Sequence, residues 1–238
     1  MGLPTLISPH FDTELPSGMV IKMRSMVMSE YKILMIAKES PENMSNAIIQ
    51  VLGNCIIGES DVGLMSLVDI EYLFIKLHAS STAKQAFQLK SKCPKCKTDN
   101  KVGVDLNQIR SSNPDFKDKT FKFPNNITIT VSTPKFKDFI DLAGPVNASK
   151  DSMDVTLKLI ASSISMVTNN DMVMKAGVDF TIDQAVTMLE SLSISEITDI
   201  SKHTNSMPRI ELSTGYVCKC GHKEPILIQG ITDFFAYL

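Results

Sequence analysis

The sequence has none of the features that mark a membrane-spanning protein or a polyanion-coating protein. No run of 18 apolar residues occurs, and the most apolar helical stretch, residues 47–57, is interrupted by Gln50, Gly53 and Asn54. A helix that spans a bilayer needs about 20 predominantly apolar residues. Neither charge sign is in excess, because 24 Lys and Arg face 26 Asp and Glu, for a formal charge of −2. This balance excludes a broadly basic nucleic-acid coat and a strongly acidic tail.

The sequence also has no recognisable export signal, and its number of cysteines is odd. The first lysine is Lys22, so the chain has no charged start followed by an apolar stretch. Five cysteines are present, and an odd number cannot pair completely into internal disulfides. We therefore expect the protein in a reducing cytosol, where closely spaced cysteines indicate metal or redox chemistry more often than structural disulfides.

The motifs of common enzyme classes are absent as well. The chain has no phosphate-binding glycine loop, no GxSxG, no HExxH and no calcium-binding loop. His10, His78 and His203 stand alone and are expected to be surface or hydrogen-bonded core residues. Residues 222–224 (HKE) resemble the His-x-Glu element of nucleobase deaminases, but that element should precede the cysteine pair. We therefore predict that the protein is not an enzyme.

What the sequence does contain is a globular composition with segments of helical and of extended patterning. Hydrophobic residues make up 43% and charged residues 21% of 238 residues, which allows one large domain or two small ones. Residues 1–18 are expected to be a loop because prolines interrupt them. Strands are predicted over residues 20–24, 87–90, 102–106, 127–132, 210–212, 216–217 and 225–229. Helices are predicted over residues 30–39, 41–57, 66–79, 152–167 and 182–202.

Four of the five cysteines form two close pairs, each in the predicted turn of a hairpin. Cys93 and Cys96 are separated by two residues, and Cys218 and Cys220 by one. A tetrahedral zinc site needs four soft ligands at about 2.3 Å from the metal, so we predict that these four thiols bind a structural Zn2+ ion. Closing the long loop between the pairs costs on the order of 4 kcal/mol. Structural zinc contributes roughly 10–16 kcal/mol and can therefore dominate.

Alternatives remain open for these thiols. His222 could replace one of them as the fourth ligand, or all four thiols could be free of metal. The Cys93–Cys96 pair also has the spacing of a redox motif, but such a motif should open a helix, and this pair lies between predicted strands. Cys55, on an apolar helix, is expected to be an inert core residue.

Several lysines lie close to both cysteine pairs in the sequence. If both turns meet at one metal, seven of them lie in one region: Lys90, Lys92, Lys95, Lys97, Lys101, Lys219 and Lys223. Such a cluster indicates either a patch for nucleic acid or another anionic partner, or a solvated rim that partly offsets a dianionic four-thiolate centre. The region lacks interleaved aromatic residues, which favours the rim. A zinc-ribbon nucleic-acid-binding protein is the alternative function.

Several segments together resemble a tail baseplate protein family of T-even-type bacteriophages. They are residues 28–40 (MSEYKILMIAKES), 69–77 (DIEYLFIKL), the Cys93/Cys96 hairpin, 215–221 (GYVCKCG) and 230–235 (GITDFF). The similarity covers roughly residues 15–110 and 205–238 and does not extend to the helical middle. It implies a baseplate hub subunit or hub assembly factor that acts in the host bacterial cytoplasm while the tail is built. It implies no catalytic residues.

Together these observations predict an α+β protein whose N-terminal helices pack on a small zinc-pinned antiparallel β-module with a helical insertion. We expect an N-terminal strand and helices in residues 1–80 and the first part of a zinc-ribbon-like module in 81–133. A helical insertion is expected in 134–205, and the second part of the module in 206–238. The expected partners are other phage baseplate or hub proteins, with neither a membrane nor nucleic acid among them. If the protein is retained after assembly, it lies in the tail baseplate.

Overall fold

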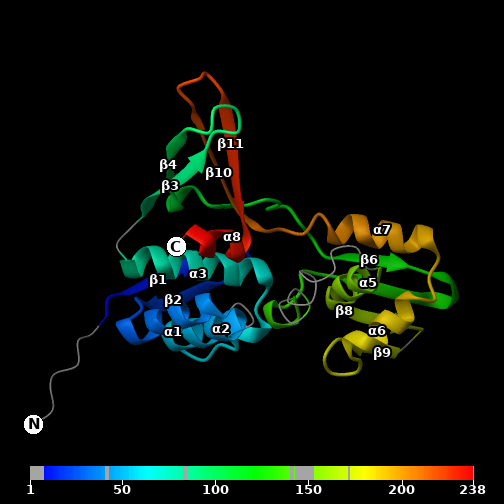
Figure 1. Ribbon diagram of the computed structural model, residues 1–238. Helices are drawn as coiled ribbons and strands as arrows, with labels where there is room; N and C mark the ends of the chain where they lie inside the picture. The colour runs from blue at the N-terminus through cyan, green and yellow to red at the C-terminus, as the bar shows by residue number, and fades with distance from the viewer. Residues whose placement is uncertain are drawn as a thin grey trace, which may run out of the picture. The chain divides into compact units, whose positions relative to one another are not determined.

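The computed structural model describes residues 8–40, 43–82, 85–139, 142, 153–170 and 172–237 (Figure 1). Helices are combined with antiparallel sheets, so the predicted α+β class is confirmed. The chain divides into two compact units. Unit 1 comprises Met1–Asp61, Val68–Ser112 and Arg209–Leu238, and unit 2 comprises Val62–Leu67 and Asn113–Pro208.

Unit 1 begins with the antiparallel hairpin of β1 (His10–Glu14) and β2 (Val20–Arg24). β2 has the predicted bounds, and its alternating side chains Ile21 and Met23 are buried. β1 falls in the stretch that was expected to be a loop. Pro9 and Pro16 lie just outside this strand, where a proline is tolerated because it has no N–H to donate. Pro9 still accepts a hydrogen bond through its carbonyl oxygen, from Ser25 N at 3.1 Å.

Three helices follow the hairpin: α1 (Met28–Glu39), α2 (Met44–Cys55) and α3 (Leu67–Thr82). α3 confirms the helix predicted over residues 66–79 and ends three residues later. Its apolar residues recur every three or four positions, and Ile70, Leu73, Phe74 and Leu77 are almost completely buried. α3 therefore packs as an inner helix of unit 1.

Two further hairpins complete unit 1. β3 (Ala86–Lys92) pairs with β4 (Asp99–Asp105), and β10 (Ile210–Val217) pairs with β11 (Lys223–Gln229) and with the short β5 (Arg110–Ser111). The turn η3 (Leu106–Gln108) and helix α8 (Gly230–Tyr237) lie at their bases. One apolar core joins α3, α8 and both hairpins. It contains Val68, Ile75, Ala79, Leu89, Val102, Val104, Leu106, Ile109, Ile210, Leu212, Ile228 and Phe234.

An aromatic residue near the C-terminus packs on this module. Phe234 is completely buried in the core just described. The side chains of Phe235 and Tyr237 lie outside the described residues.

Unit 2 contains a four-stranded antiparallel sheet in the order β6-β7-β8-β9, together with helices, and residues 136–139 are also helical. Its strands are β6 (Lys119–Lys122), β7 (Ile127–Val131), β8 (Ile164–Asn169) and β9 (Met172–Lys175). Among its helices are α5 (Met153–Ser162), α6 (Ile182–Leu189) and α7 (Ile194–Thr204), and it has short 3-10 helices at η2 (Val62–Leu64) and η4 (Pro124–Asn126). A second apolar core, separate from that of unit 1, joins the sheet to these helices.

The helices of unit 2 are shorter than predicted. The helix expected over residues 152–167 ends at Ser162, and the apolar run that follows forms β8. The helix expected over residues 182–202 is two helices, because Ser193 caps α7 by accepting a hydrogen bond from Glu196 N. None of the helices in the described ranges has both the length and the apolar composition needed to cross a bilayer.

Candidate metal centre

The structure brings the four predicted cysteines to one place. Cys93 and Cys96 lie in the turn between β3 and β4, and Cys218 and Cys220 lie in the turn between β10 and β11. All four Sγ atoms lie within 4.8 Å of one another. The Sγ atoms of Cys93 and Cys220 are 3.7 Å apart, and those of Cys96 and Cys218 are 3.4 Å apart. Each close contact joins one hairpin to the other.

These distances fit a tetrahedral metal. Four sulfur atoms bound at about 2.3 Å to one zinc ion lie about 3.8 Å from each other. The two contacts of 3.4 and 3.7 Å and the limit of 4.8 Å bracket that separation. A set of four thiolates also suits soft or borderline metals such as zinc. The cluster could therefore hold a metal ion without a large movement of either turn.

The two turns differ in length but share the same backbone conformation and a similar backbone hydrogen bond. In each turn the residue after the second cysteine has a left-handed conformation, with φ of 59° at Lys97 and 80° at Gly221. Lys97 N donates to Cys93 O at 2.9 Å, and Gly221 N donates to Cys218 O at 2.8 Å. The narrow spacing of Cys218 and Cys220 is thus accommodated by a shorter turn.

The thiols differ in exposure and in acidity. Cys93 and Cys218 are buried, whereas Cys96 and Cys220 are exposed. Hydrogen bonds with the side chain and backbone of Thr98, followed by those with neighbouring thiols, lower the pKa of Cys96 to about 6. A backbone hydrogen bond from His222 lowers the pKa of Cys220, but contacts with Cys96 and the other thiols and burial outweigh it and raise that pKa to about 11. Because the thiols contact one another, their protons are lost as a coupled set.

His222 takes part in a different interaction. Its Nε2 atom lies 2.7 Å from Oε2 of Glu224. Among the described residues, the group of potential metal ligands at the hairpin turns contains the four cysteines and no histidine. The structure therefore gives His222 the role of a partner for Glu224, and the four sulfur atoms complete a tetrahedral set without it.

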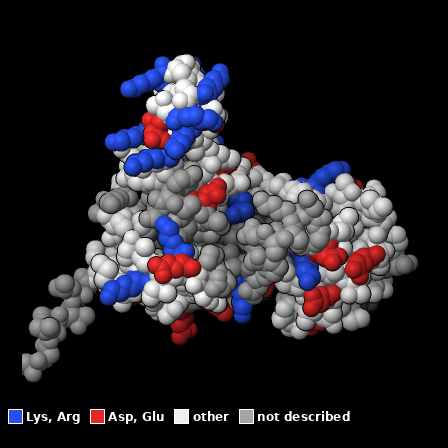
Figure 2. All heavy atoms as spheres, viewed as in Figure 1, with Lys and Arg blue, Asp and Glu red and all other residues white. Residues whose placement is uncertain are grey.

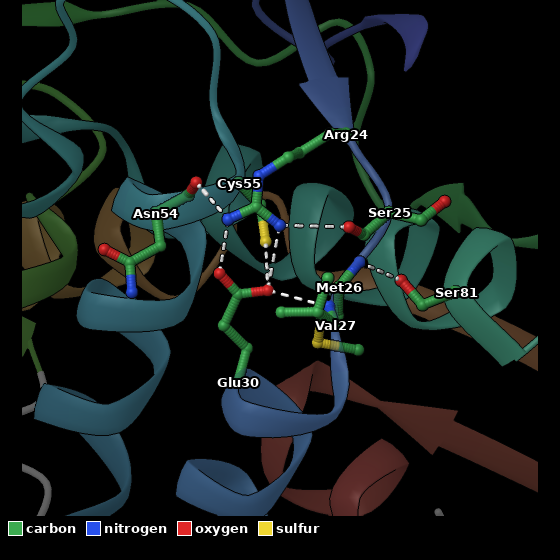
Figure 3. Close-up of polar contacts among 8 residues, drawn as sticks. All are labelled: Arg24, Ser25, Met26, Val27, Glu30, Asn54, Cys55 and Ser81. Atoms are coloured by element: carbon green, nitrogen blue, oxygen red, sulfur yellow. Dashed lines mark hydrogen bonds and ion pairs between the residues drawn. The ribbon is translucent and has the colours of Figure 1, made fainter. Parts of the chain in front are cut away.

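Cys55 lies away from the cluster, on α2, and is completely buried. Its Sγ atom donates to Oε2 of Glu30 at 3.5 Å, and Arg24 binds the same carboxylate through two nitrogen atoms (Figure 3). Burial, followed by the negative charge of Glu30, raises the pKa of Cys55 to about 12. The thiol is therefore held in its unreactive protonated form, in agreement with the prediction that Cys55 is an inert core residue.

A buried ion pair beneath the hairpins was not identified from the sequence. Glu71 on α3 is completely buried, and its Oε1 atom accepts hydrogen bonds from Nε and Nη2 of Arg209 at 2.9 and 2.6 Å. Its Oε2 atom accepts from Ile210 N at 2.9 Å. In the sequence, Glu71 is an acidic residue on the apolar face of a predicted helix, which indicates a buried charge. Its partner could not be identified, because Arg209 is 138 positions away in the chain.

The seven lysines that accompany the cysteines are all exposed in the structure. They lie around the ends of the two hairpins, where Figure 2 shows positive side chains gathered. The aromatic residues nearest to them in the chain, Phe87 and Tyr216, are partly buried against the core of unit 1. The hairpin ends thus carry charge without exposed aromatic rings.

Comparison with known proteins gives one family. The sequence profile of the family described as T4 bacteriophage base plate protein matches residues 8–236. The match includes both cysteine turns and all of the described part of unit 2. No curated protein and no solved structure has a significant match to the chain.

Proposed function

The chain belongs to the T4 bacteriophage base plate protein family, and from this membership we propose that it is a non-enzymatic baseplate hub subunit or hub assembly factor. The family supports a structural role in the phage tail baseplate. Such a protein works through contacts with other baseplate or hub proteins. It meets them in the host bacterial cytoplasm during assembly and, if it is retained, in the tail of the virion.

A structural Zn2+ ion held by Cys93, Cys96, Cys218 and Cys220 is part of the proposal. The observation that carries it is the convergence of four sulfur atoms from two hairpins that are far apart in the chain. Zinc bound there supplies a cross-link between the hairpins that a reducing cytosol does not break. All four positions of a tetrahedral ion would be taken by sulfur, and a catalytic zinc keeps one position open. The ligand set therefore supports a structural ion.

The cross-link gives the assembly role a physical basis. The chain leaves unit 1 after Ser112 and returns at Arg209. The β10–β11 hairpin therefore pairs with the β3–β4 hairpin only after residues 113–208 have been synthesised. A metal that joins the two turns fixes the surface that unit 1 presents to its partners. Binding then carries a smaller ordering cost, because the surface is already in place.

The proposed metal is tested by replacing Cys93 and Cys96 with Ser in the full-length protein. We expect the native protein to contain one zinc ion per chain by elemental analysis, and the double variant to contain almost none. The variant should also lose several kcal/mol of stability, because structural zinc contributes roughly 10–16 kcal/mol. Cys55→Ala is the matched control and should retain the metal. Full stability of the double variant in excess chelator would contradict the proposal.

The assembly role needs a separate measurement. A tagged copy of the protein should co-purify with identified baseplate or hub proteins from infected cells. The tagged double cysteine variant should recover less of the same proteins. If the native protein co-purifies with none of them, the proposed function is wrong whatever its metal content.

A further inference from the structure

The exposed lysines at the hairpin ends form a surface that the proposed metal site does not explain. We call them the lysine crown: Lys90, Lys92, Lys95, Lys97, Lys101, Lys219 and Lys223. Five come from the β3–β4 hairpin and two from the β10–β11 hairpin, and all are exposed (Figure 2). The cysteine cluster brings both groups to one place.

The crown places like charges directly across from each other. Lys90 on β3 is opposite Lys101 on β4 in the antiparallel register. Like charges that face each other across two strands destabilise the pair. Of the remaining lysines, Lys92 is opposite Asp99, and Lys223 is opposite the exposed Val217. The Lys90–Lys101 pair therefore favours a bound anion that screens its two charges.

Little negative charge lies at the hairpin ends to offset the crown. The acids among residues 90–101 and 217–224 are Asp99 and Glu224, and Glu224 already contacts His222. None of the seven lysines forms an ion pair with a residue that the structure describes. A zinc ion with four thiolates would add two negative charges and leave the crown positive. The chain as a whole has a formal charge of −2, so the positive field is local.

The support beneath the crown is rigid. Thr214 on β10 donates a hydrogen bond to Gly103 O on β4 at 2.9 Å, which joins the hairpins below their turns. The cysteine cluster joins them again at the turns. Two attachments along the strands hold the lysine backbones in a fixed pattern, so a partner with a matching pattern of anions loses little freedom on binding.

The chemistry of the crown favours carboxylates over nucleic acid. Its cations are all lysine, a compact point charge, and it has no arginine, the residue that recognises phosphates and bases through two parallel hydrogen bonds. Base stacking needs exposed aromatic rings, and the neighbouring Phe87 and Tyr216 pack against the core. We infer that the lysine crown docks onto an acidic surface of another baseplate protein. This inference rests on the proposed function and names the chemistry of its partner.

The contact is tested by zero-length cross-linking with a carbodiimide, which joins a lysine amine to a carboxylate that touches it. The sample is the native assembly complex purified from infected cells. The variant carries Lys90→Gln, Lys95→Gln, Lys101→Gln and Lys219→Gln. The matched control removes the same charge from exposed lysines of unit 2 through Lys117→Gln, Lys122→Gln, Lys158→Gln and Lys175→Gln. A second variant, with only Lys90→Gln and Lys101→Gln, leaves both cysteine turns intact.

We expect cross-linked peptides that join crown lysines to Asp or Glu of an identified baseplate protein. Loss of four ion pairs should lower the amount of that baseplate protein that co-purifies with the chain about ten-fold or more, while the unit 2 control keeps the native amount. The double variant should show a smaller loss in the same direction. Zinc content and the midpoint of thermal unfolding verify that each variant is folded.

Two results would overturn the inference. In the first, the native complex contains the baseplate partner but gives no carboxylate cross-links to the crown, in which case the docking surface is wrong while the baseplate role stands. In the second, the four-lysine variant still co-purifies with the baseplate partner in the native amount and loses retention of duplex DNA at about 0.15 M salt, which would identify the crown as a nucleic-acid surface. If the native protein joins no baseplate complex, the proposed function is wrong, and this inference is wrong with it.

Discussion

Glu71 is the residue on which three separate parts of unit 1 converge. Its carboxylate lies on α3 and binds the side chain of Arg209, where the chain returns from unit 2. It also accepts hydrogen bonds from Ile210 N, at the start of β10, and from Ile231 N, in the first turn of α8. A completely buried carboxylate is tolerated because these donors replace the water it has lost. Removing any one donor leaves a charge that is expensive to bury.

Gly230 provides the sharpest test of this cluster. It has a φ of 70°, and a Cβ atom there would lie 2.0 Å from Nη2 of Arg209 and 2.9 Å from Oε1 of Glu71. Gly230→Ala therefore adds two costs, the left-handed strain of an L residue and displacement of Arg209 from the buried carboxylate. We expect a loss of about 2–5 kcal/mol in the free energy of unfolding, measured with urea.

The control for this prediction is Gly18→Ala. Gly18 also has a positive φ, 83°, but a Cβ atom there meets nothing within 4 Å. This variant should lose only about 1–2 kcal/mol in the free energy of unfolding, from the strain of an alanine in the left-handed conformation. Equal losses in the two alanine variants would mean that the Glu71–Arg209 pair adjusts without cost.

At the scale of elements, the start of α1 shows how one side chain organises a helix. Glu30 occupies the third position of α1 and accepts a hydrogen bond from Val27 N at 2.8 Å, which caps the helix (Figure 3). The same carboxylate binds Arg24 at the end of β2, and Arg24 in turn donates to Asn54 O on α2. One acidic residue thereby joins β2, α1 and α2.

Acid should weaken this junction. Burial raises the pKa of Glu30, but hydrogen bonds from Arg24 and Val27 N and the charge of Arg24 outweigh it, so the pKa lies below the ordinary value for a glutamate. A carboxyl whose pKa is lower in the folded state contributes stability above its unfolded pKa, and this contribution disappears as the pH falls through the folded pKa. We expect the stability difference between the native protein and Glu30→Gln to be constant near neutral pH and to shrink below pH 4.5.

The measurement is urea unfolding of both proteins over a series of pH values. Subtracting one curve from the other removes acid effects common to both, including any loss of metal from the cysteines. Glu39→Gln, an exposed position at the other end of α1, is the control and should show little pH-dependent difference. A Glu30→Gln difference that stays unchanged at acid pH would show that this carboxylate contributes no charge-dependent stability.

How far elements can be predicted from sequence depends on whether a local pattern has one interpretation. β2 and α3 were predicted well because alternation in one and a spacing of three and four in the other are unambiguous. β8 was predicted as helix because its apolar residues directly continue the pattern of α5, and a short apolar run fits both structures. β1 was missed because nearby prolines were given more weight than the five residues between them.

The candidate site shows the same division between local and long-range information. Close spacing and turn residues marked Cys93 and Cys96 as one ligand pair and Cys218 and Cys220 as another. Their convergence depends on the shared core of two hairpins, which no local pattern contains. The partner of Glu71 was beyond prediction for this reason, because Arg209 becomes its neighbour only when the chain returns from unit 2.

At the scale of the whole molecule, the longer segment of unit 2, residues 113–208, leaves and re-enters unit 1 at adjacent points. Ser112 N donates to Arg209 O at 2.9 Å, and Ser111 is opposite Ile210 in the antiparallel pairing of β5 and β10. Each unit also has its own apolar core. The metal ligands all belong to unit 1, so without residues 113–208 the cysteine cluster needs only a connection between Ser112 and Arg209, while residues 62–67 stay as the link between α2 and α3.

Residues 113–208 can therefore be replaced by a two-residue Asn-Gly turn, which suits a short antiparallel connection. We expect the shortened protein to fold, to bind one zinc ion per chain and to unfold in one transition that a chelator shifts to lower temperature. The full-length protein should add a second, chelator-insensitive transition from unit 2. Calorimetry and elemental analysis measure both properties, and a shortened protein with Cys93→Ser and Cys96→Ser is the control. If the shortened protein is soluble but binds no metal, unit 2 is needed to bring the two hairpins together, and the cysteine cluster depends on the whole chain.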